Sequence, residues 1–297
     1  MNRLTSESRF LLLALLLISS FFLSSSVAAQ KDKRPPQSAG PTIKRTTTRH
    51  ENLRLAYGGT VTISAAPAGS ITIEGWQRNE VEVSAEIELQ AGSAADLDRL
   101  LAVNNFAVDE DANHVRILTT GTHDKKFMKR VAKDFPKSLL GLPWKIDFRV
   151  KVPAMTDLEI DAGNGPIRLS GVEGAIRLNA LESVADLTLT GGHVSATVQS
   201  GTINVTIPSR SWRGLGADIK LAQGSLNVDL PPGFSADIDA QVMRAGEIRN
   251  SYTNLQPRER NGITAQSMRA RAGSGGASLS FTVGDGVIHF RQLDSKQ

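Results

Sequence analysis

The chain has 297 residues, with 34 Lys and Arg against 30 Asp and Glu, a formal charge of +4, and no cysteine. Without cysteine no disulfide framework can stabilise an exported chain, so its stability must come from a buried core, for which this length suffices. Aromatic residues make up only 5% of the chain. So mild a positive excess with so few stacking side chains argues against a nucleic-acid-binding protein.

The first 29 residues have the pattern of a secretory signal peptide. Arg3 and Arg9 flank the start of an apolar stretch that ends at Leu23, and Val27-Ala28-Ala29 supplies small residues for cleavage after Ala29. The apolar stretch is shorter than the roughly twenty residues that span a bilayer, which favours a cleaved signal over a retained anchor. We expect an exported mature chain, periplasmic or at the cell surface, without a transmembrane segment.

The segment that follows predicts a linker and then a β-rich region. Residues 30–52 are rich in basic residues, Pro and Thr, and are expected to form a basic linker. From Leu53 apolar residues alternate with polar ones, and glycines mark turns between the runs, which predicts strands. We therefore expect an N-terminal β-rich cap over 53–152, interrupted by a short helix over 94–102 that begins at Ser93.

A basic segment over residues 123–140 interrupts this alternation. Phe127, Val131 and Phe135 are spaced four residues apart, which predicts a helical insertion of about three turns with one apolar stripe. The insertion either caps one end of the strands with its lysines in water, or settles on an anionic membrane or polymer. The residues expected to contact an anionic partner are Lys125, Lys126, Lys129, Arg130, Lys133 and Lys137.

Short apolar pairs recur from Leu158 onward, spaced roughly nine to eleven residues apart and often preceded by glycine. Such period-two alternation is typical of half-buried strands, which bury a continuous core only when they stack. The sequence therefore predicts an all-β protein. Residues 153–292 are expected to form a β-solenoid, a stack of short strands like a single-stranded right-handed β-helix, next to a mixed N-terminal cap with one or two short helices. A β-sandwich or a β-propeller fits this pattern less well.

A second basic segment, Arg244 to Gly276, breaks the repeat rhythm. It carries six arginines against two glutamates, which predicts an extended loop or irregular turn of the stack with a cationic surface. Four of these arginines are expected to be further contacts for an anionic partner: Arg258, Arg260, Arg269 and Arg271.

The order of these segments carries a family resemblance. A strand from Gly69 to Trp76 is followed by Val81-Glu82-Val83, and Val150-Lys151-Val152-Pro153 leads into units such as Ser200-Gly201-Thr202-Ile203-Asn204-Val205. This order resembles the bacterial "putative adhesin" family of domains of unknown function, over Leu53 to Phe290. The resemblance implies an exported or envelope-associated protein and brings no catalytic residues with it.

The sequence contains no motif for catalysis or cofactor binding. It lacks a nucleophile elbow, a phosphate-binding loop and a dinucleotide fingerprint, and the carboxylates of the repeats form no recurring column. Five histidines lack metal-ligand spacing: His50, His114, His123, His193 and His289. We expect no catalytic residue, metal or cofactor.

The function expected from these features is that of a non-enzymatic envelope or surface protein, an adhesin-like binding or scaffold module. Its partner would be an envelope polymer, a lipid surface or a protein. Two alternatives stay open: a carbohydrate-active β-helix of the polysaccharide lyase or hydrolase kind, and an envelope-stress signalling partner.

Overall fold

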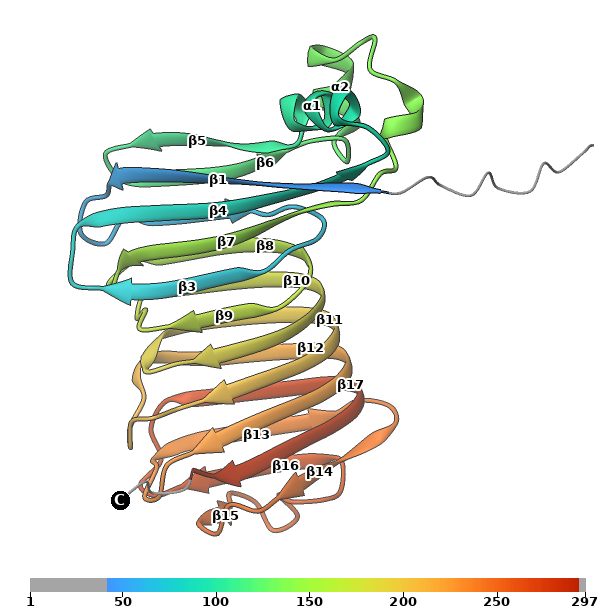
Figure 1. Ribbon diagram of the computed structural model, residues 1–297. Helices are drawn as coiled ribbons and strands as arrows, with labels where there is room; N and C mark the ends of the chain where they lie inside the picture. Colours follow the sequence, from blue (N-terminus) through green and yellow to red (C-terminus); the bar gives the residue numbers. More distant parts are fainter. Residues whose placement is uncertain (1–41, 294–297) are drawn as a thin grey trace, which may run out of the picture. The chain divides into compact units, whose positions relative to one another are not determined.

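The structure is a computed structural model that describes residues 42–293. Within this range the chain forms 17 strands, two α-helices and one 3₁₀-helix, and every strand belongs to one mixed sheet (Figure 1). The prediction of a mainly β protein with one or two short helices is confirmed. The predicted signal peptide, residues 1–29, lies outside the described residues.

Parallel pairing at a fixed offset organises the middle of the sheet. Strands β8 (Asp157–Asn164) and β9 (Ile167–Ser170) pair with the two halves of β10 (Ala175–Thr188), and β10 pairs with β11 (Gly191–Thr206). Each of these pairings joins residues 18 positions apart, as in Leu158 with Ile176 and Ile176 with Val194. The offset places apolar residue over apolar residue, which explains why the short apolar pairs recur in the sequence.

The long strands bend in the middle, and this corrects one expectation. The sequence suggests that successive apolar pairs form separate strands joined by turns. In the structure two such pairs lie within one strand, because β10 and β12 (Arg213–Leu230) each continue through a corner. Glycine occupies the corner of β11 at Gly201 and that of β12 at Gly224, while β10 has Ser183 at the corresponding position. Gly224 has a φ of 135° and stacks on Gly201, and a Cβ on Gly224 would lie 1.9 Å from the carbonyl oxygen of Gly201. Only glycine fits such a backbone without strain.

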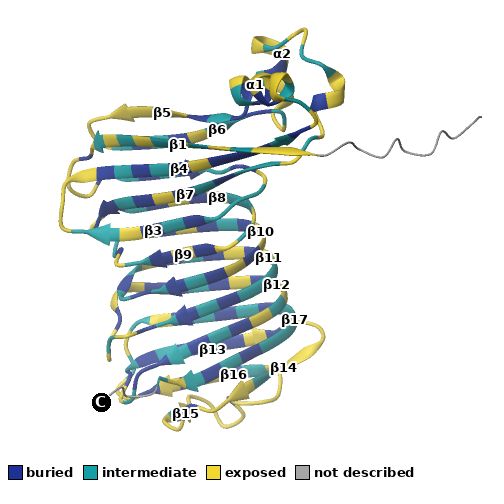
Figure 2. Cartoon of the chain, viewed as in Figure 1, coloured by how far each residue is buried: buried dark blue, intermediate teal, exposed yellow. Residues whose placement is uncertain are grey.

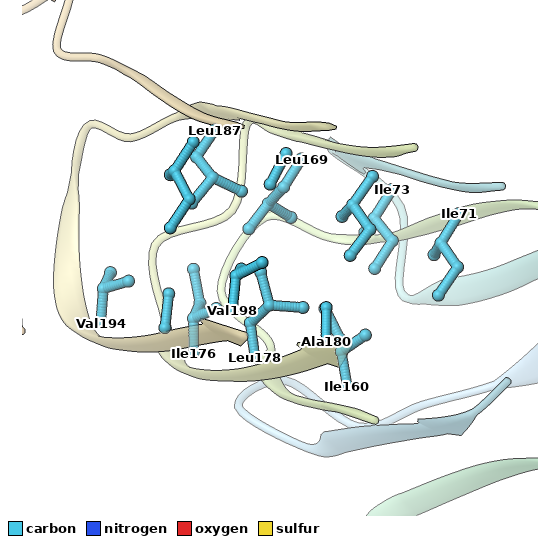
Figure 3. Close-up of a cluster of buried hydrophobic side chains, with 14 of the residues drawn as sticks. Ile71, Ile73, Ile160, Leu169, Ile176, Leu178, Ala180, Leu187, Val194 and Val198 are labelled. Carbon is cyan, nitrogen blue, oxygen red and sulfur yellow. The ribbon is translucent and has the colours of Figure 1, made fainter. Parts of the chain in front are cut away.

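The core lies between the two runs of strands that these corners produce. Along the strands buried and exposed residues alternate (Figure 2). The close-up shows Ile71, Leu169 and Leu187 facing Ile176 and Val198 across the interior (Figure 3). These side chains are at most 2% exposed. An aliphatic interior of this kind supplies the stability that the absence of disulfides requires.

The N-terminal part adds strands with other pairings to one end of the sheet. The longest are β1 (Ile43–Arg54) and β4 (Glu80–Ala91), which pair antiparallel with each other, and β4 also pairs antiparallel with β7 (Trp144–Pro153). The predicted linker 30–52 is thus too long, because β1 begins at Ile43. The remaining elements are β2 (Thr60–Ser64), β3 (Ile71–Trp76), α1 (Ala94–Val103), β5 (Asn105–Asp111) and β6 (His114–Thr120).

The arginine-rich stretch at the other end contains strands, which excludes the first of its two expectations, an extended loop, and leaves the second, an irregular turn of the stack. Strand β17 (Ser278–Gln292) pairs in parallel with β12, and β13 (Ala236–Val242) pairs with the first half of β17. Between β13 and β17 the chain forms three further strands, β14 (Gly246–Asn250), β15 (Leu255–Pro257) and β16 (Ser267–Ala272). Strand β16 pairs antiparallel with β13, so Arg269 and Arg271 are held in register with a neighbouring strand.

Candidate binding surface around the basic insertion

The basic insertion leaves the sheet between β6 and β7 and carries a single short helix. Helix α2 (Lys125–Val131) begins after Asp124, whose carboxylate accepts hydrogen bonds from the backbone N–H groups of Lys126 at 2.8 Å and Phe127 at 3.0 Å. The helix ends at Ala132, and a 3₁₀-helix η1 (Lys137–Leu139) follows. The helical part is therefore shorter than the three turns predicted over 123–140.

The apolar side chains of the insertion differ from the predicted stripe. Val131 is 52% exposed, and Phe135 lies beyond the end of α2. Leu139, 5% exposed, joins the continuous core and anchors the segment, while Met128 is buried but lies outside that core. The base of the insertion is fixed by the buried Asn104, whose side-chain oxygen accepts a hydrogen bond from the backbone N–H of Thr122 at 2.8 Å.

A hollow of about 860 Å³ opens between α2 and η1. Its lining combines apolar side chains with cations from the helix, its C-terminal cap and the 3₁₀-helix. The lining residues are Thr122, His123, Lys125, Met128, Lys129, Ala132, Lys133, Phe135, Lys137, Leu140 and Gly141. Four lysines that the sequence suggests as partner contacts thus surround one apolar cavity, and the chain beyond the helix returns to form its far wall.

The cations of the insertion form no ion pair within the described part of the chain. All six predicted contact residues of the insertion are exposed. None of the ion pairs formed among residues 42–293 includes any of them: Lys125, Lys126, Lys129, Arg130, Lys133 and Lys137. The segment contains only two carboxylates, Asp124 and Asp134. The surface around the hollow therefore carries a concentrated net positive charge.

His123 contributes little to this charge at neutral pH. Its ring lies 5.4 Å, centroid to centroid, from the ring of Trp144. Partial burial lowers the pKa of His123 below its ordinary value, and the neighbouring Asp124 opposes this shift without cancelling it. Because the imidazole stays neutral, the positive charge around the hollow comes from the lysines.

The arginine-rich stretch presents a different surface although its composition is similar. Arg271 Nε lies 2.9 Å from Asp237, Arg269 pairs with Glu259 at 3.2 Å, and Arg258 pairs with Asp239. Of the four arginines suggested as partner contacts, only Arg260 forms no ion pair with any residue of the range 42–293. These arginines are positioned mainly by carboxylates of the protein itself.

The polar side chains along the outer face of the stack also bind one another. The side-chain amide of Asn204 donates to Asp186 at 2.8 Å, and that of Asn227 donates to Asn204 at 2.8 Å. Such ladders between stacked strands add to the stability of the stack. These polar side chains are thus engaged in holding neighbouring strands together.

The hydroxyl–imidazole contact nearest to a catalytic arrangement has the wrong direction for activating a nucleophile. Thr62 Oγ1 lies 2.7 Å from His114 Nε2 and 3.1 Å from Glu159, while Arg116 Nη2 lies 2.9 Å from His114 Nδ1. Arginine can only donate, so Nδ1 accepts and Nε2 carries the proton. The imidazole therefore donates to Thr62 and takes no proton from it, and the network ties β6, β2 and β8 together. No cluster of potential metal ligands occurs within residues 42–293.

Comparisons with known proteins give only distant structural likeness. No family model and no curated protein matches the sequence. A "putative cell adhesion protein" from Clostridium sporogenes ATCC 15579 is similar with a TM-score of 0.43 and 10% identity, covering 84% of this chain and 100% of that chain. A "putative adhesin" from Bacteroides fragilis NCTC 9343 has a TM-score of 0.32 and 9% identity, with coverage of 83% and 97%. A "putative lipid binding protein" from Parabacteroides distasonis ATCC 8503 has a TM-score of 0.26 and 11% identity, with coverage of 82% and 96%. At these values the function has to be argued from the residues of the chain itself.

Proposed function

We propose that this chain is an exported, non-enzymatic binding module of the cell envelope and that the basic insertion is its contact surface for an anionic lipid layer. The observation that carries the proposal is a set of six exposed cations that form no ion pair with residues 42–293, four of which line an apolar hollow. A polyanionic polymer would use the charge but not the apolar walls. A lipid surface uses both, because basic residues bind its headgroups and apolar side chains enter the boundary below them.

The stacked strands serve as the scaffold that presents this surface. We interpret them as a β-solenoid, supported by the repeated 18-residue offset between β8, β10 and β11 and by the glycine corners. A scaffold of this kind is rigid along its axis, because each strand is hydrogen-bonded to the strands before and after it. The insertion at one end would then be held at a fixed distance from whatever binds the opposite end.

Export is the part of the proposal that depends on the N-terminal sequence. The basic, apolar and small-residue segments of residues 1–29 support cleavage after Ala29 and a periplasmic or cell-surface location. Among the described residues, no helix is long and apolar enough to cross a bilayer. Mass spectrometry of the protein recovered from cells would give a mature N-terminus at Gln30, and an uncleaved chain would contradict this step.

The lipid contact can be tested with two matched variants. In the first, Lys126, Lys129, Arg130 and Lys133 become Gln; in the second, Arg258, Arg260, Arg269 and Arg271 become Gln. Both lose four positive charges. At roughly 1 kcal/mol per basic residue near an anionic surface, the first variant should bind phosphatidylglycerol vesicles about a thousandfold more weakly at low salt.

The second variant is the control for net charge. Three of its four arginines already face carboxylates, so its vesicle affinity should fall less than about tenfold. Equal losses in both variants would show that overall charge alone drives binding. Absence of vesicle binding by the unaltered protein, or binding to an anionic polysaccharide alone, would exclude the lipid contact.

A further inference from the structure

The hollow of the basic insertion has the size and the lining of a small-molecule site. Its volume of about 860 Å³ lies within the range of roughly 300–1,000 Å³ typical of ligand pockets. Such pockets are mainly apolar, with a few polar groups that fix the orientation of the ligand. Here Met128, Phe135 and Leu140 supply the apolar part, and lysines supply the polar groups.

Two of the three apolar side chains that line the hollow, Met128 and Leu140, lie outside the core of the protein, whereas Phe135 packs against it. Met128 is only 7% exposed, yet it lies outside the continuous core, beneath the hollow. Leu140 remains 41% exposed where it lines the opposite wall. A hydrocarbon chain in the hollow would remove the exposed apolar surface of Leu140 from water and lie against Met128, and such removal of apolar surface is the driving force for binding a hydrocarbon chain.

The cationic rim calls for an anion. Lys125 and Lys129 lie four residues apart on α2, where like charges repel each other. Lys133 and Lys137 continue the rim beyond the helix, and no carboxylate within residues 42–293 pairs with any of these four. A single negative group at the rim would relieve the repulsion of the whole set.

Another large hollow shows that this combination is specific. It has a volume of about 610 Å³ on the outer face of β4 and β7 and also contains cations, Lys145 and Arg149. Its lining includes Glu86 and Asp147, and Lys145 donates to Asp147 at 2.6 Å. The charges there are compensated, so that hollow has no comparable preference for an anion.

We propose that the hollow between α2 and η1 binds one molecule of an anionic lipid. Its acyl chain would lie against Met128, Phe135 and Leu140, and its headgroup would be held by the lysine rim. This inference deepens the proposed function, on which it rests, by adding a site for a single lipid molecule to a surface for a lipid layer. It distinguishes specific capture of a lipid from general attraction to a charged membrane.

The test uses the mature protein and a soluble lipid mimic. Dodecyl phosphate, titrated below its micelle-forming concentration in a calorimeter, should bind with one-to-one stoichiometry. Inorganic phosphate supplies the charge alone and dodecyl maltoside the chain alone, and each should bind at least about tenfold more weakly. Equal binding of dodecyl phosphate and dodecyl maltoside would overturn the role of the lysines, and equal binding of inorganic phosphate would overturn the role of the hollow.

Variants at neighbouring positions separate the hollow from the surface around it. Ala132 lines the cavity, so Ala132→Trp should fill it and weaken dodecyl phosphate binding at least about tenfold. Val131→Trp is the matched control, since the adjacent Val131 is exposed and does not line the cavity. The affinity of this variant for dodecyl phosphate should stay within about twofold of that of the unaltered protein. Leu140→Gln, at a partly exposed position that the fold tolerates, should weaken binding severalfold.

The outcomes distinguish the two proposals. Vesicle binding that depends on the insertion lysines, without binding of dodecyl phosphate or without any effect of Ala132→Trp and Leu140→Gln, would overturn the single-lipid site and leave the proposed function standing. If instead dodecyl phosphate bound one-to-one but the protein showed no lysine-dependent binding to vesicles, the proposed function would be overturned and the single-lipid site would stand.

Discussion

Two segments of this protein have the same charge balance and opposite electrostatic behaviour. The basic insertion and the arginine-rich stretch each contain six Lys or Arg residues and two Asp or Glu residues. In the insertion no cation forms an ion pair with a described residue. In the arginine-rich stretch five of the six do, namely Arg244, Arg249, Arg258, Arg269 and Arg271. The number of charges in a segment therefore does not decide how much charge it offers to a partner.

The difference follows from where each segment lies relative to the sheet. Strand β16 runs antiparallel to β13, which places Arg271 opposite Asp237 and Arg269 opposite Asp239. Opposite charges facing each other across two strands pair readily. Of these two opposed pairs only Arg271 and Asp237 form an ion pair, while Arg269 pairs with Glu259 and Asp239 pairs with Arg258. The sheet thus brings carboxylates of β13 and β17 to three arginines of the stretch, whereas the insertion leaves the sheet and has no neighbouring strand to do so.

The largest expected effect compares a corner of the stacked strands, which support the arginine-rich stretch, with the basic insertion. Gly224 has a φ of 135° and would place a Cβ 1.9 Å from the oxygen of Gly201. Gly224→Ala combines backbone strain with overpacking and should lower the free energy of unfolding by about 3 kcal/mol or more. Urea denaturation followed by circular dichroism measures this loss.

Gly141 in the insertion is the control for this substitution. A Cβ at Gly141 would have no heavy atom within 4 Å. Gly141→Ala should therefore change the free energy of unfolding by no more than about 0.5 kcal/mol. If the two alanine variants were equally stable, the close stacking of Gly224 on Gly201 would not constrain the fold.

The second prediction converts the neutralised segment into a charged one. Asp237→Asn together with Asp239→Asn removes the carboxylates that face Arg271 and Arg258. Two freed cations, at roughly 1 kcal/mol each, should raise the affinity for phosphatidylglycerol vesicles about tenfold or more. Vesicle sedimentation at low salt measures the gain.

The control for this gain keeps the same change in net charge without freeing a cation. Glu159 and Asp161 on β8 accept hydrogen bonds from Thr62 and Asn179 and form no ion pair with any described residue. Glu159→Gln with Asp161→Asn should raise vesicle affinity by less than about threefold. An equal gain in both double variants would mean that net charge matters and local pairing does not.

Much of the fold could be predicted from the sequence because its signals are local. Alternation of apolar and polar residues identified the strands, and the helix begun by Ser93 is found at Ala94–Val103. The bends could not be predicted in the same way. Ile176 and Leu187 lie in one strand because backbone pairing with β11 continues through the corner, and pairing between distant segments leaves no mark in a short window of sequence.

The positive charge of the candidate site can be predicted from the sequence, but the hollow and the residues that line it cannot. Composition predicts the lysines of the insertion. It does not predict that Met128 and Leu140 line a hollow, because the predicted apolar stripe requires an unbroken helix up to Phe135. Pro136 and Pro143 were the available signals that the chain turns back after α2. The pairing of Arg271 with Asp237 could not be foreseen, since the two residues are 34 positions apart and meet only through the strand register.

The smallest expected effect is the loss of stability at acidic pH, which should involve the ion pairs of the arginine-rich stretch and not the insertion. A hydrogen bond from Arg271 holds the pKa of Asp237 below its usual value of 3.8, and Arg244 lowers the pKa of Asp285 in the same way. A carboxylate with a lowered folded-state pKa stabilises the fold above its unfolded pKa, and this contribution is lost as the pH falls through the folded value.

The free energy of unfolding of the unaltered protein should therefore decrease more steeply between pH 5 and pH 3 than that of Asp237→Asn. Lys129→Gln should follow the unaltered protein, because its cation has no carboxylate partner in the described chain. The effect ranks last because exposed ion pairs contribute at most about 1 kcal/mol each. Urea denaturation at several pH values measures the slopes. If the free energy of unfolding of Asp237→Asn fell as steeply with decreasing pH as that of the unaltered protein, the ion pair between Arg271 and Asp237 would not stabilise the fold.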